Sequence, residues 1–363
     1  MAIAYYYPIV FAVGLIVTVL TTPLFIRLAF RVGAVDKPGP RRVNVKPITR
    51  MGGPAMFLGF AAASVVAASV NLVSWQYMSA ALAGSFIAFL VGLWDDIRSL
   101  RPVPKLLGQI AAGCVAYGLG VRIEFVTNPF GNGMLLLPEW ISFGITVFWL
   151  VGITNAMNLI DGLDGLAAGI VSIATLTFFL VAVSRGQTES ALMALAVAGA
   201  CGGFLRWNFY PAKTIMGDSG AYFLGFTAAA LAVNGAFKST TALTLLIPIF
   251  ALGVPIFDTT FAIARRIHDH KPVMHEADKG HLHHRLLASG LNHRQSVLVC
   301  YLITLALSAA SLAMIKQWKL ALCLLALVAA LALLLLFVGK VIKRRRPDGT
   351  MYGKPKIDNA GKA

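Results

Sequence analysis

Long apolar segments alternate with short polar stretches through almost the whole chain. Each apolar segment is close to the length of about 20 residues that crosses a bilayer as an α-helix. Eleven spans are predicted, at Pro8–Phe30, Gly53–Val73, Met78–Leu93, Leu106–Val121, Trp140–Asn158, Leu166–Ser184, Ala191–Leu205, Ala221–Ala236, Ala242–Ala264, Ser296–Ile315 and Leu320–Gly339. The pattern predicts an all-α, polytopic integral membrane protein. Residues 1–340 form one membrane domain, and residues 341–363 form a basic, disordered cytoplasmic tail.

The composition agrees with this prediction. Of the 363 residues, 58% are hydrophobic and only 13% are charged, and the mean hydropathy is +0.77. A soluble chain could not cover its surface with so few charges. No basic region precedes the first apolar segment, which favours a first span over a cleaved signal. The four cysteines are far apart and show no metal-binding spacing.

The charges of the loops are unequal on the two sides of the membrane. One side receives 26 of the 31 lysines and arginines, and positive loops favour the cytoplasm. The N-terminus is therefore predicted outside and the C-terminus inside. The net charge of +16 follows this topology and does not indicate nucleic-acid binding. Eleven of the fifteen acids and all seven histidines fall in the loops of the same inner side, although the rule does not require it. Their placement predicts an active site at the cytoplasmic face.

Two carboxylate motifs stand next to predicted spans. Asp95 and Asp96 end the third span and are followed by Lys105. Adjacent carboxylates repel, and a cation or a shared proton relieves the repulsion. Mg²⁺ suits such ligands and keeps positions free for substrate phosphates. Asp218, in the run Met216–Gly220, stands between two glycines that allow close approach of a charged ligand. Ordinary capping of the eighth span is the alternative.

A third motif joins the fifth and sixth spans. Asn155, Asn158, Asp161 and Asp164 are spaced by three, so they share one helix face, although the glycines that follow the two aspartates indicate a break. A polar turn between two spans is the alternative. At the centre of a span each aspartate would cost about 2.5–3.5 kcal/mol, which makes such residues functional candidates.

Basic residues form two further motifs. His281, His283, His284 and Arg285 lie in a histidine-rich inner loop. The arginine fork and the imidazoles favour phosphate binding over zinc, because no standard structural-zinc pattern is present. A solvated loop is the alternative. The first inner loop, 36–53, holds five basic residues and three prolines, and it serves either membrane topology or binding of a nucleotide phosphate.

These motifs, in this order, resemble the polyprenyl-phosphate N-acetylhexosamine-1-phosphate transferases of glycosyltransferase family 4. The resemblance covers about Asp36 to His293. The motifs that carry it are Asp-x-Pro-x-x-Arg…Gly-Gly at 36–53, Asp-Asp-x-x-x-Leu…Lys…Gln at 95–109, Asn-x-x-Asn-x-x-Asp-Gly-x-Asp-Gly-Leu at 155–166, Gly-Asp-Ser-Gly at 217–220 and His-x-His-His-Arg at 281–285. The last motif resembles the WecA and TagO branch, which uses UDP-GlcNAc. The chain departs from the family at Asn44 and Thr49, where a histidine and a proline are common.

The resemblance implies a reaction in the inner membrane of a bacterium. Undecaprenyl phosphate attacks the β-phosphorus of a UDP-N-acetylhexosamine, chiefly UDP-GlcNAc, and UMP leaves. This is the first membrane step of a cell-envelope glycan such as teichoic acid, O-antigen or common antigen. The implied cofactor is Mg²⁺, with Mn²⁺ as a substitute, and a homodimer is suggested by analogy.

The resemblance also implies roles for individual residues. Asp218 is the leading metal ligand, and Asp95 and Asp96 line the same site. Four carboxylates are the catalytic candidates: Asp95, Asp96, Asp161 and Asp164. Seven residues are expected to bind substrate: Lys105, Asn155, Asn158, His281, His283, His284 and Arg285.

Two rival functions remain. One is the phospho-N-acetylmuramoyl-pentapeptide transferase of peptidoglycan synthesis, which uses the same chemistry on a different nucleotide. The other is a cation-coupled secondary transporter, whose acids should lie in the middle of its spans and whose halves should repeat. The acids of this chain cluster at one membrane face, and no internal repeat is visible. A transferase is therefore the preferred interpretation.

Overall fold

The computed structural model describes residues 2–36, 47–127, 134–236, 246–269 and 280–344. It confirms an all-α membrane protein with many helices in one bundle. The helices are α1 Tyr6–Val32, preceded by the short 3₁₀ helix η1 Ala2–Tyr5, α2 Gly52–Ser69, α3 Trp75–Arg98, α4 Pro102–Gly118, α5 Glu139–Ile160, α6 Leu166–Ser184, α7 Thr188–Asn208, α8 Gly217–Ala236, α9 Leu246–Ala251, α10 Gly253–His268, α11 Leu282–Ala288, α12 His293–Met314 and α13 Trp318–Arg344.

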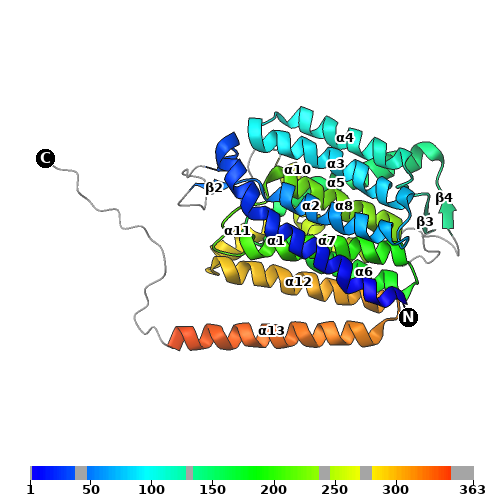
Figure 1. Ribbon diagram of the computed structural model, residues 1–363. Coiled ribbons are helices and arrows are strands. Elements are labelled where there is room, and N and C mark those ends of the chain that lie inside the picture. The colour runs from blue at the N-terminus through cyan, green and yellow to red at the C-terminus, as the bar shows by residue number, and fades with distance from the viewer. Residues whose placement is uncertain (1, 37–46, 128–133, 237–245, 270–279, 345–363) are drawn as a thin grey trace.

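The long helices lie side by side along one axis (Figure 1). Within the described ranges, eight helices are long and apolar enough to cross a membrane: α1 extended by η1, α2, α3, α5, α6, α7, α12 and α13. The start of α1 and the end of α13 lie at opposite ends of the bundle (Figure 1). α13 runs along the edge and packs against α12.

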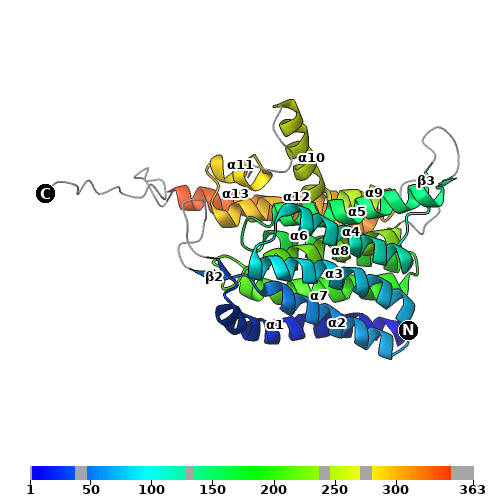
Figure 2. The ribbon, with the colours of Figure 1, turned by 90° about the horizontal axis from the view of Figure 1, so that it is seen from above.

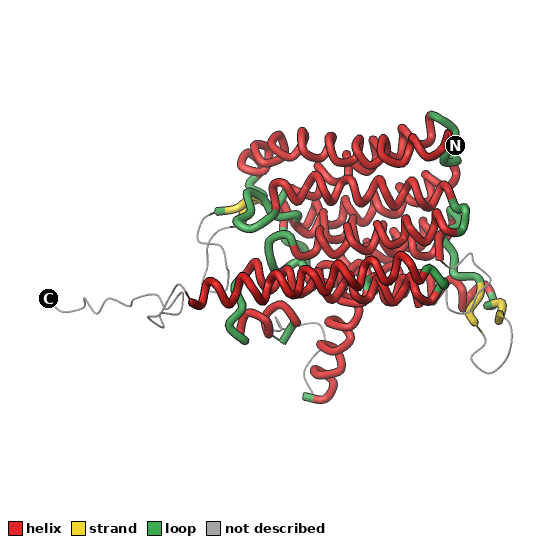
Figure 3. Tube along the Cα trace, turned by 90° about the horizontal axis from the view of Figure 1, so that it is seen from below, coloured by secondary structure: helices red, strands yellow, loops and turns green. Residues whose placement is uncertain are grey.

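The ninth predicted span differs from the expectation. Ala242–Ala264 is not one helix, because α9 ends at Ala251 and α10 begins at Gly253, while positions 242–245 lie outside the described residues. Pro255 has no N–H to donate to the carbonyl of Ala251, which disfavours a continuous helix at this point. Figures 2 and 3 show α10 projecting from the side of the bundle. The fourth predicted span is shifted toward the N-terminus, because Leu106–Val121 was expected and α4 runs from Pro102 to Gly118.

α8 is the central helix of the bundle. It packs against α2, α3, α5, α6 and α7, and nearly every side chain from Ala221 to Val233 is buried. A helix that is hydrophobic on all sides belongs in the interior. Gly225 lets α5 approach, because a Cβ at this position would lie 2.8 Å from the Cα of Thr154. The burial of α8 fixes its first residue, Gly217, at one end of the bundle, where the polar motifs gather.

Two small antiparallel hairpins lie at opposite ends of the bundle (Figure 1). β1 Val35–Asp36 pairs with β2 Ile48–Thr49 beside the end of α1. β3 Phe125–Thr127 pairs with β4 Met134–Leu136 in the connection between α4 and α5, and residues 128–133 of this connection lie outside the described residues. The basic tail was predicted to begin at 341, but α13 continues to Arg344, and residues 345–363 are not described.

Candidate active site

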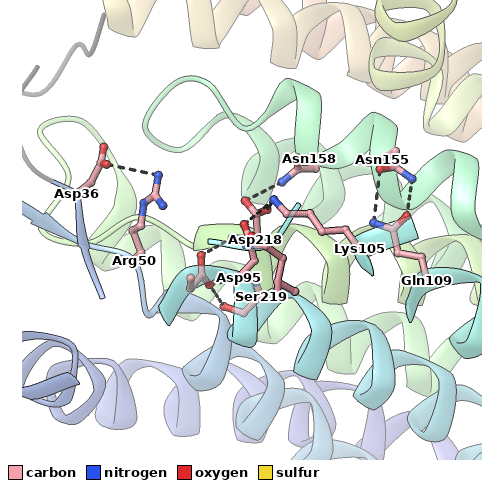
Figure 4. A network of polar contacts seen from close by, with 11 residues as sticks. Asp36, Arg50, Asp95, Lys105, Gln109, Asn155, Asn158, Asp218 and Ser219 are labelled. Atoms are coloured by element: carbon pink, nitrogen blue, oxygen red, sulfur yellow. Dashed lines mark hydrogen bonds and ion pairs between the residues drawn. The ribbon is translucent and has the colours of Figure 1, made fainter. Parts of the chain in front are cut away.

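An ammonium group shared by two carboxylates lies at the centre of the site (Figure 4). Lys105, in the first turn of α4, places Nζ 2.6 Å from Asp95 Oδ2 and 3.0 Å from Asp218 Oδ2. Asp95 comes from the end of α3 and Asp218 from the start of α8. The structure therefore brings together three predicted residues that are separated by up to 123 positions in the chain, counted from Asp95 to Asp218.

Asp96 points toward the backbone that begins α8. Its Oδ1 accepts a hydrogen bond from the N–H of Asp218 at 2.8 Å, and its Oδ2 accepts from the N–H and the hydroxyl of Ser219 at 3.0 and 2.6 Å. A carboxylate has about four lone-pair sites, so most of this capacity is already used. Asp96 caps α8 and thereby aims Asp218. This geometry favours a positioning role over the predicted role as a metal ligand.

Glycines permit the close approach of α3 to α8. A Cβ at Gly92, one turn before Asp96, would collide with the backbone of Asp218. Gly217 has φ +71°, a conformation that L side chains rarely adopt. A Cβ at Gly217 would also lie 2.5 Å from Asp96 Oδ2. The glycine of the Gly-Asp-Ser-Gly motif is thus needed to let the carboxylate of Asp96 reach the start of α8.

The two asparagines of the third motif have different partners. Asn158 Nδ2 donates to Asp218 Oδ1 at 3.1 Å, so Asn158 joins the carboxylate cluster. Asn155, one turn earlier in α5, faces Gln109 of α4 (Figure 4). Its Nδ2 donates to Gln109 Oε1 at 2.6 Å and to the carbonyl of Val151 at 2.8 Å. Asn155 therefore links α4 to α5, and the contact gives it a positioning role beside the predicted substrate-binding role.

Asp161 follows the last residue of α5 and is half-buried. Its side chain accepts no hydrogen bond from any residue within the described ranges. Burial, together with the nearby carboxylates of Asp218, Asp164 and Asp96, raises the pKa of Asp161 well above its usual range. Of the predicted carboxylates it is the one that retains its oxygens for a ligand or a proton.

The predicted break between the fifth and sixth spans is confirmed. α5 ends before Asp161, and Gly165 caps α6 in a left-handed conformation with φ +83°. Asp164 Oδ2 accepts a hydrogen bond from the N–H of Ala212 at 3.0 Å, and the N–H of Gly165 donates to Asn208 Oδ1 at 2.9 Å. Asp164 thus ties this turn to the connection after α7, which is a structural use of a predicted catalytic carboxylate.

The histidine segment lies against the same turn. A Cβ at Gly162 would collide with Nε2 of His283, so the glycine makes room for the ring. The His281 and His283 rings are parallel, with centroids 6.0 Å apart, and the His284 ring lies 4.2 Å from that of His283. Burial and the neighbouring His284 and His281 lower the pKa of His283 to about 4. His283 is therefore neutral near pH 7.

Two further polar residues belong to the histidine segment or contact it. Arg285 is exposed on α11, and no described contact joins it to the carboxylates. Asp258, in α10, accepts from Nδ1 of His281 at 2.8 Å and was not among the predicted site residues. An aspartate inside the apolar span predicted at Ala242–Ala264 was the signal that could have found it, because ionisable residues are rare in such segments.

The first inner loop is described only at its two ends. Arg50 pairs with Asp36 at 3.4 Å, while 37–46, with Asn44 and most of the basic residues, lie outside the described residues. Thr49, where the related family commonly has proline, donates from Oγ1 to Oγ1 of Thr214 at 2.8 Å. This bond ties β2 to the segment before α8. The loop therefore borders the site.

The charges of the cluster favour a cationic ligand. Asp95 and Asp218 face a single ammonium group, Asp96 accepts hydrogen bonds at the start of α8 beside them, and Asp161 lies nearby. No group of three or more His, Cys, Asp or Glu side chains within the described ranges is arranged to hold a metal ion. Mg²⁺ needs only one or two carboxylates when substrate phosphates supply further oxygens. Asp95 and Asp218, whose oxygens already converge on one cation, fit that requirement.

Several known proteins are similar in sequence to this chain over most of its length. The family model for glycosyl transferase family 4 matches residues 78–236. The chain is 43% identical over 295 residues to a probable undecaprenyl-phosphate N-acetylglucosaminyl 1-phosphate transferase of Bacillus subtilis, covering 81% of each protein.

Two further relatives carry related names. A decaprenyl-phosphate N-acetylglucosaminephosphotransferase of Mycolicibacterium smegmatis is 35% identical over 350 residues, which is 89% of this chain and 85% of the relative. A phospho-N-acetylmuramoyl-pentapeptide-transferase of Desulforudis audaxviator is 33% identical over 333 residues, 85% of this chain and 96% of the relative.

Proposed function

The chain belongs to glycosyl transferase family 4, and from this membership we infer that it is a phosphoglycosyl transferase that acts on a polyprenyl phosphate in the membrane. We propose that the donor is UDP-GlcNAc and the acceptor is undecaprenyl phosphate. The products are undecaprenyl-diphosphate-GlcNAc and UMP. The names of the two relatives with the highest identities quoted above support GlcNAc as the sugar. The observation that carries the proposal is the convergence of Asp95, Lys105 and Asp218 at one end of the bundle.

The reaction exchanges one phosphoanhydride bond for another. An oxygen of the lipid phosphate attacks the β-phosphorus, and the bond to the bridging oxygen breaks so that UMP leaves with the electron pair. The lipid phosphate is mostly dianionic near pH 7, since the second pKa of a phosphate monoester is about 6. It needs little help from a general base. The main obstacle is repulsion between two anions, which positioned positive charge reduces.

Residues of the cluster have distinct parts in this proposal. Lys105 carries a fixed positive charge toward the phosphates. Asn158 holds Asp218, and Asp96 holds the backbone of α8, so that the metal-binding carboxylate is oriented before substrate arrives. Asp161 is placed to bind the nucleotide or to hold a proton, because its oxygens have no partner within the described part of the chain.

Mg²⁺ is the proposed cofactor, and Asp218 and Asp95 are its proposed ligands. When bound there, the ion would supply positive charge to the diphosphate of the donor. The ligand assignment rests on the two carboxylate oxygens that lie 2.6 and 3.0 Å from the ammonium of Lys105, a position that is compatible with a cation.

The proposed site faces the cytoplasm of a bacterial inner membrane. The end of the bundle with the carboxylate cluster is the end that the inner loops share, and those loops hold 26 of the 31 lysines and arginines. Nucleotide sugars are therefore expected to reach the site from the cytoplasm. We propose that the product enters synthesis of a cell-envelope glycan, with teichoic acid, O-antigen and common antigen as candidates.

A donor comparison tests the proposed function. Purified protein in detergent with undecaprenyl phosphate and Mg²⁺ is given UDP-GlcNAc, UDP-GalNAc or UDP-MurNAc-pentapeptide, and release of UMP is measured. We expect release from UDP-GlcNAc and its loss with EDTA. Release from the pentapeptide donor alone would assign the peptidoglycan reaction instead. No release from any donor would contradict a transferase, and cation-driven transport would then be the function to measure.

A further inference from the structure

We propose that Asp258 is a positioning residue for the transfer reaction, which holds His281 with its Nδ1 protonated and its Nε2 presented to substrate. The inference rests on the proposed function for its kinetic consequence. The geometry on which it stands is independent of the reaction. No sequence motif pointed to this residue.

The contact between α10 and the histidine segment uses both oxygens of one carboxylate. Asp258 Oδ2 lies 2.8 Å from Nδ1 of His281, and Oδ1 accepts a hydrogen bond from the backbone N–H of Leu282 at 2.7 Å. The exposed fractions of the Asp258 and His281 side chains are only 8% and 7%. Asp258 therefore fixes the ring of His281 and the first N–H of α11 at the same time. Asp258 belongs to α10, which projects from the bundle (Figure 2).

The carboxylate determines which nitrogen of His281 carries a proton. An ionised carboxylate only accepts hydrogen bonds, so Nδ1 must be the donor. Nε2 has no hydrogen-bond partner in the part of the chain that the structure describes. In a neutral ring Nε2 is an acceptor, and in a charged ring it is a cationic donor. Either form is suited to a phosphate oxygen or to a hydroxyl of the sugar.

The position of His281 makes this arrangement relevant to the site. Its ring is parallel to that of His283 at 6.0 Å, and His283 rests on Gly162, next to Asp161. The rings of His281 and His283 therefore connect Asp258 to the turn that contains Asp161 and Gly162. The side chain that orients a metal-binding histidine typically affects affinity or activity about 10- to 100-fold, and we expect an effect of similar size for Asp258.

Asp258→Asn tests this assignment because the backbone N–H of Leu282 fixes the orientation of the new side-chain amide. The N–H of Leu282 is a donor and requires the amide oxygen of the new side chain. The amide NH₂ then faces His281 Nδ1, which must become an acceptor. Nε2 would become a neutral donor, a form that neither protonation state of the native ring presents. The substitution alters one proton and leaves the shape nearly unchanged.

The first readout does not depend on activity. In protein labelled with ¹⁵N-histidine and reconstituted in bilayers, the Nδ1 resonance of His281 is assigned by its loss in His281→Gln. We expect a protonated Nδ1 in the native protein and an unprotonated one in Asp258→Asn. An unprotonated Nδ1 in the native protein, or no change on substitution, would overturn the proposal.

The second readout is a double-mutant cycle on UMP release. We expect Asp258→Asn to lower kcat/KM for the donor about 10- to 100-fold, Asp258→Glu to recover part of it, and Asp258→Asn to have no further effect in His281→Gln. Asp269→Asn, at the exposed end of the same helix, is the matched control. Equal loss in both backgrounds would show that Asp258 does not act through His281. Failure of the proposed function appears separately, as no UMP release from native protein.

Discussion

The ammonium group of Lys105 contacts two carboxylates. A single substitution can remove its positive charge and test whether that charge contributes to catalysis. Lys105→Gln keeps a hydrogen-bond donor, on a side chain one bond shorter, but removes the positive charge between Asp95 and Asp218. We expect kcat/KM for the nucleotide donor to fall about 100-fold, the size seen when one electrostatic contact to a transition state is removed. Lys319→Gln, at the exposed start of α13, is the control. Activity within threefold of the native value would show that the charge of Lys105 has no catalytic part.

His283 provides a pH test at the residue scale. Its pKa falls from 6.5 to about 4 in the folded protein, because burial and then the neighbouring histidines disfavour its charged form. Between these values the unfolded chain binds more protons than the folded one, so stability falls as pH drops below about 6.5. We expect His283→Gln to flatten the fall in Tm between pH 6.5 and 4.5 in detergent. His268→Gln, whose side chain is 89% exposed, should leave it unchanged. An unaltered slope in His283→Gln would contradict the assignment.

At the scale of elements, the close crossing of α3 and α8 determines where the carboxylate cluster lies. Gly92 has no room for a side chain against the backbone of Asp218, whereas a Cβ at Gly144 in α5 meets nothing within 4 Å. We expect Gly92→Val to separate the two helices, abolish UMP release and lower the free energy of unfolding by about 1–3 kcal/mol. Gly144→Val should retain activity. Native activity in Gly92→Val would show that this close crossing is not needed.

The helices that are marked by long apolar segments were predictable from the sequence. The division of a helix near a proline was not. Apolar length located the long spans, and the glycines that follow Asp161 and Asp164 indicated the break at Gly165, because both signals are local in the sequence. The division of the ninth span was missed, since a proline in a first turn is compatible with a helix and its consequence depends on what α10 packs against.

The membership of the site was predictable, but the contacts of its residues were not. The motifs identified Asp95, Lys105, Asn158 and Asp218, which all meet in one cluster. No spacing indicates that Asn155 faces Gln109. Such pairings depend on helix rotation and on contacts between residues far apart in the chain. Asp258 was missed for the same reason, because its partner lies in another element, 23 positions later.

At the scale of the whole molecule, the two ends of the bundle differ in charge and chemistry. Leu136, on β4, lies at the end opposite to the site and is 81% exposed. Ser289 follows α11 beside the histidine segment and is exposed. In a variant without native cysteines, a membrane-impermeant maleimide should label Leu136→Cys in intact cells. Ser289→Cys should react only after permeabilisation. The reverse result would place the site outside and contradict the orientation inferred from the positive loops.

Reversal of the proposed reaction is the most direct test of the account. The substrates and products each contain one phosphoanhydride that is broken or made, so the transfer should run backwards. Labelled UMP is incubated with purified protein, Mg²⁺ and undecaprenyl-diphosphate-GlcNAc, and label is sought in UDP-GlcNAc. We expect label to appear only when the lipid diphosphate is present, and to be lost in Asp218→Asn. Forward release of UMP without any such exchange, or exchange that survives Asp218→Asn, would contradict a direct transfer at this carboxylate cluster.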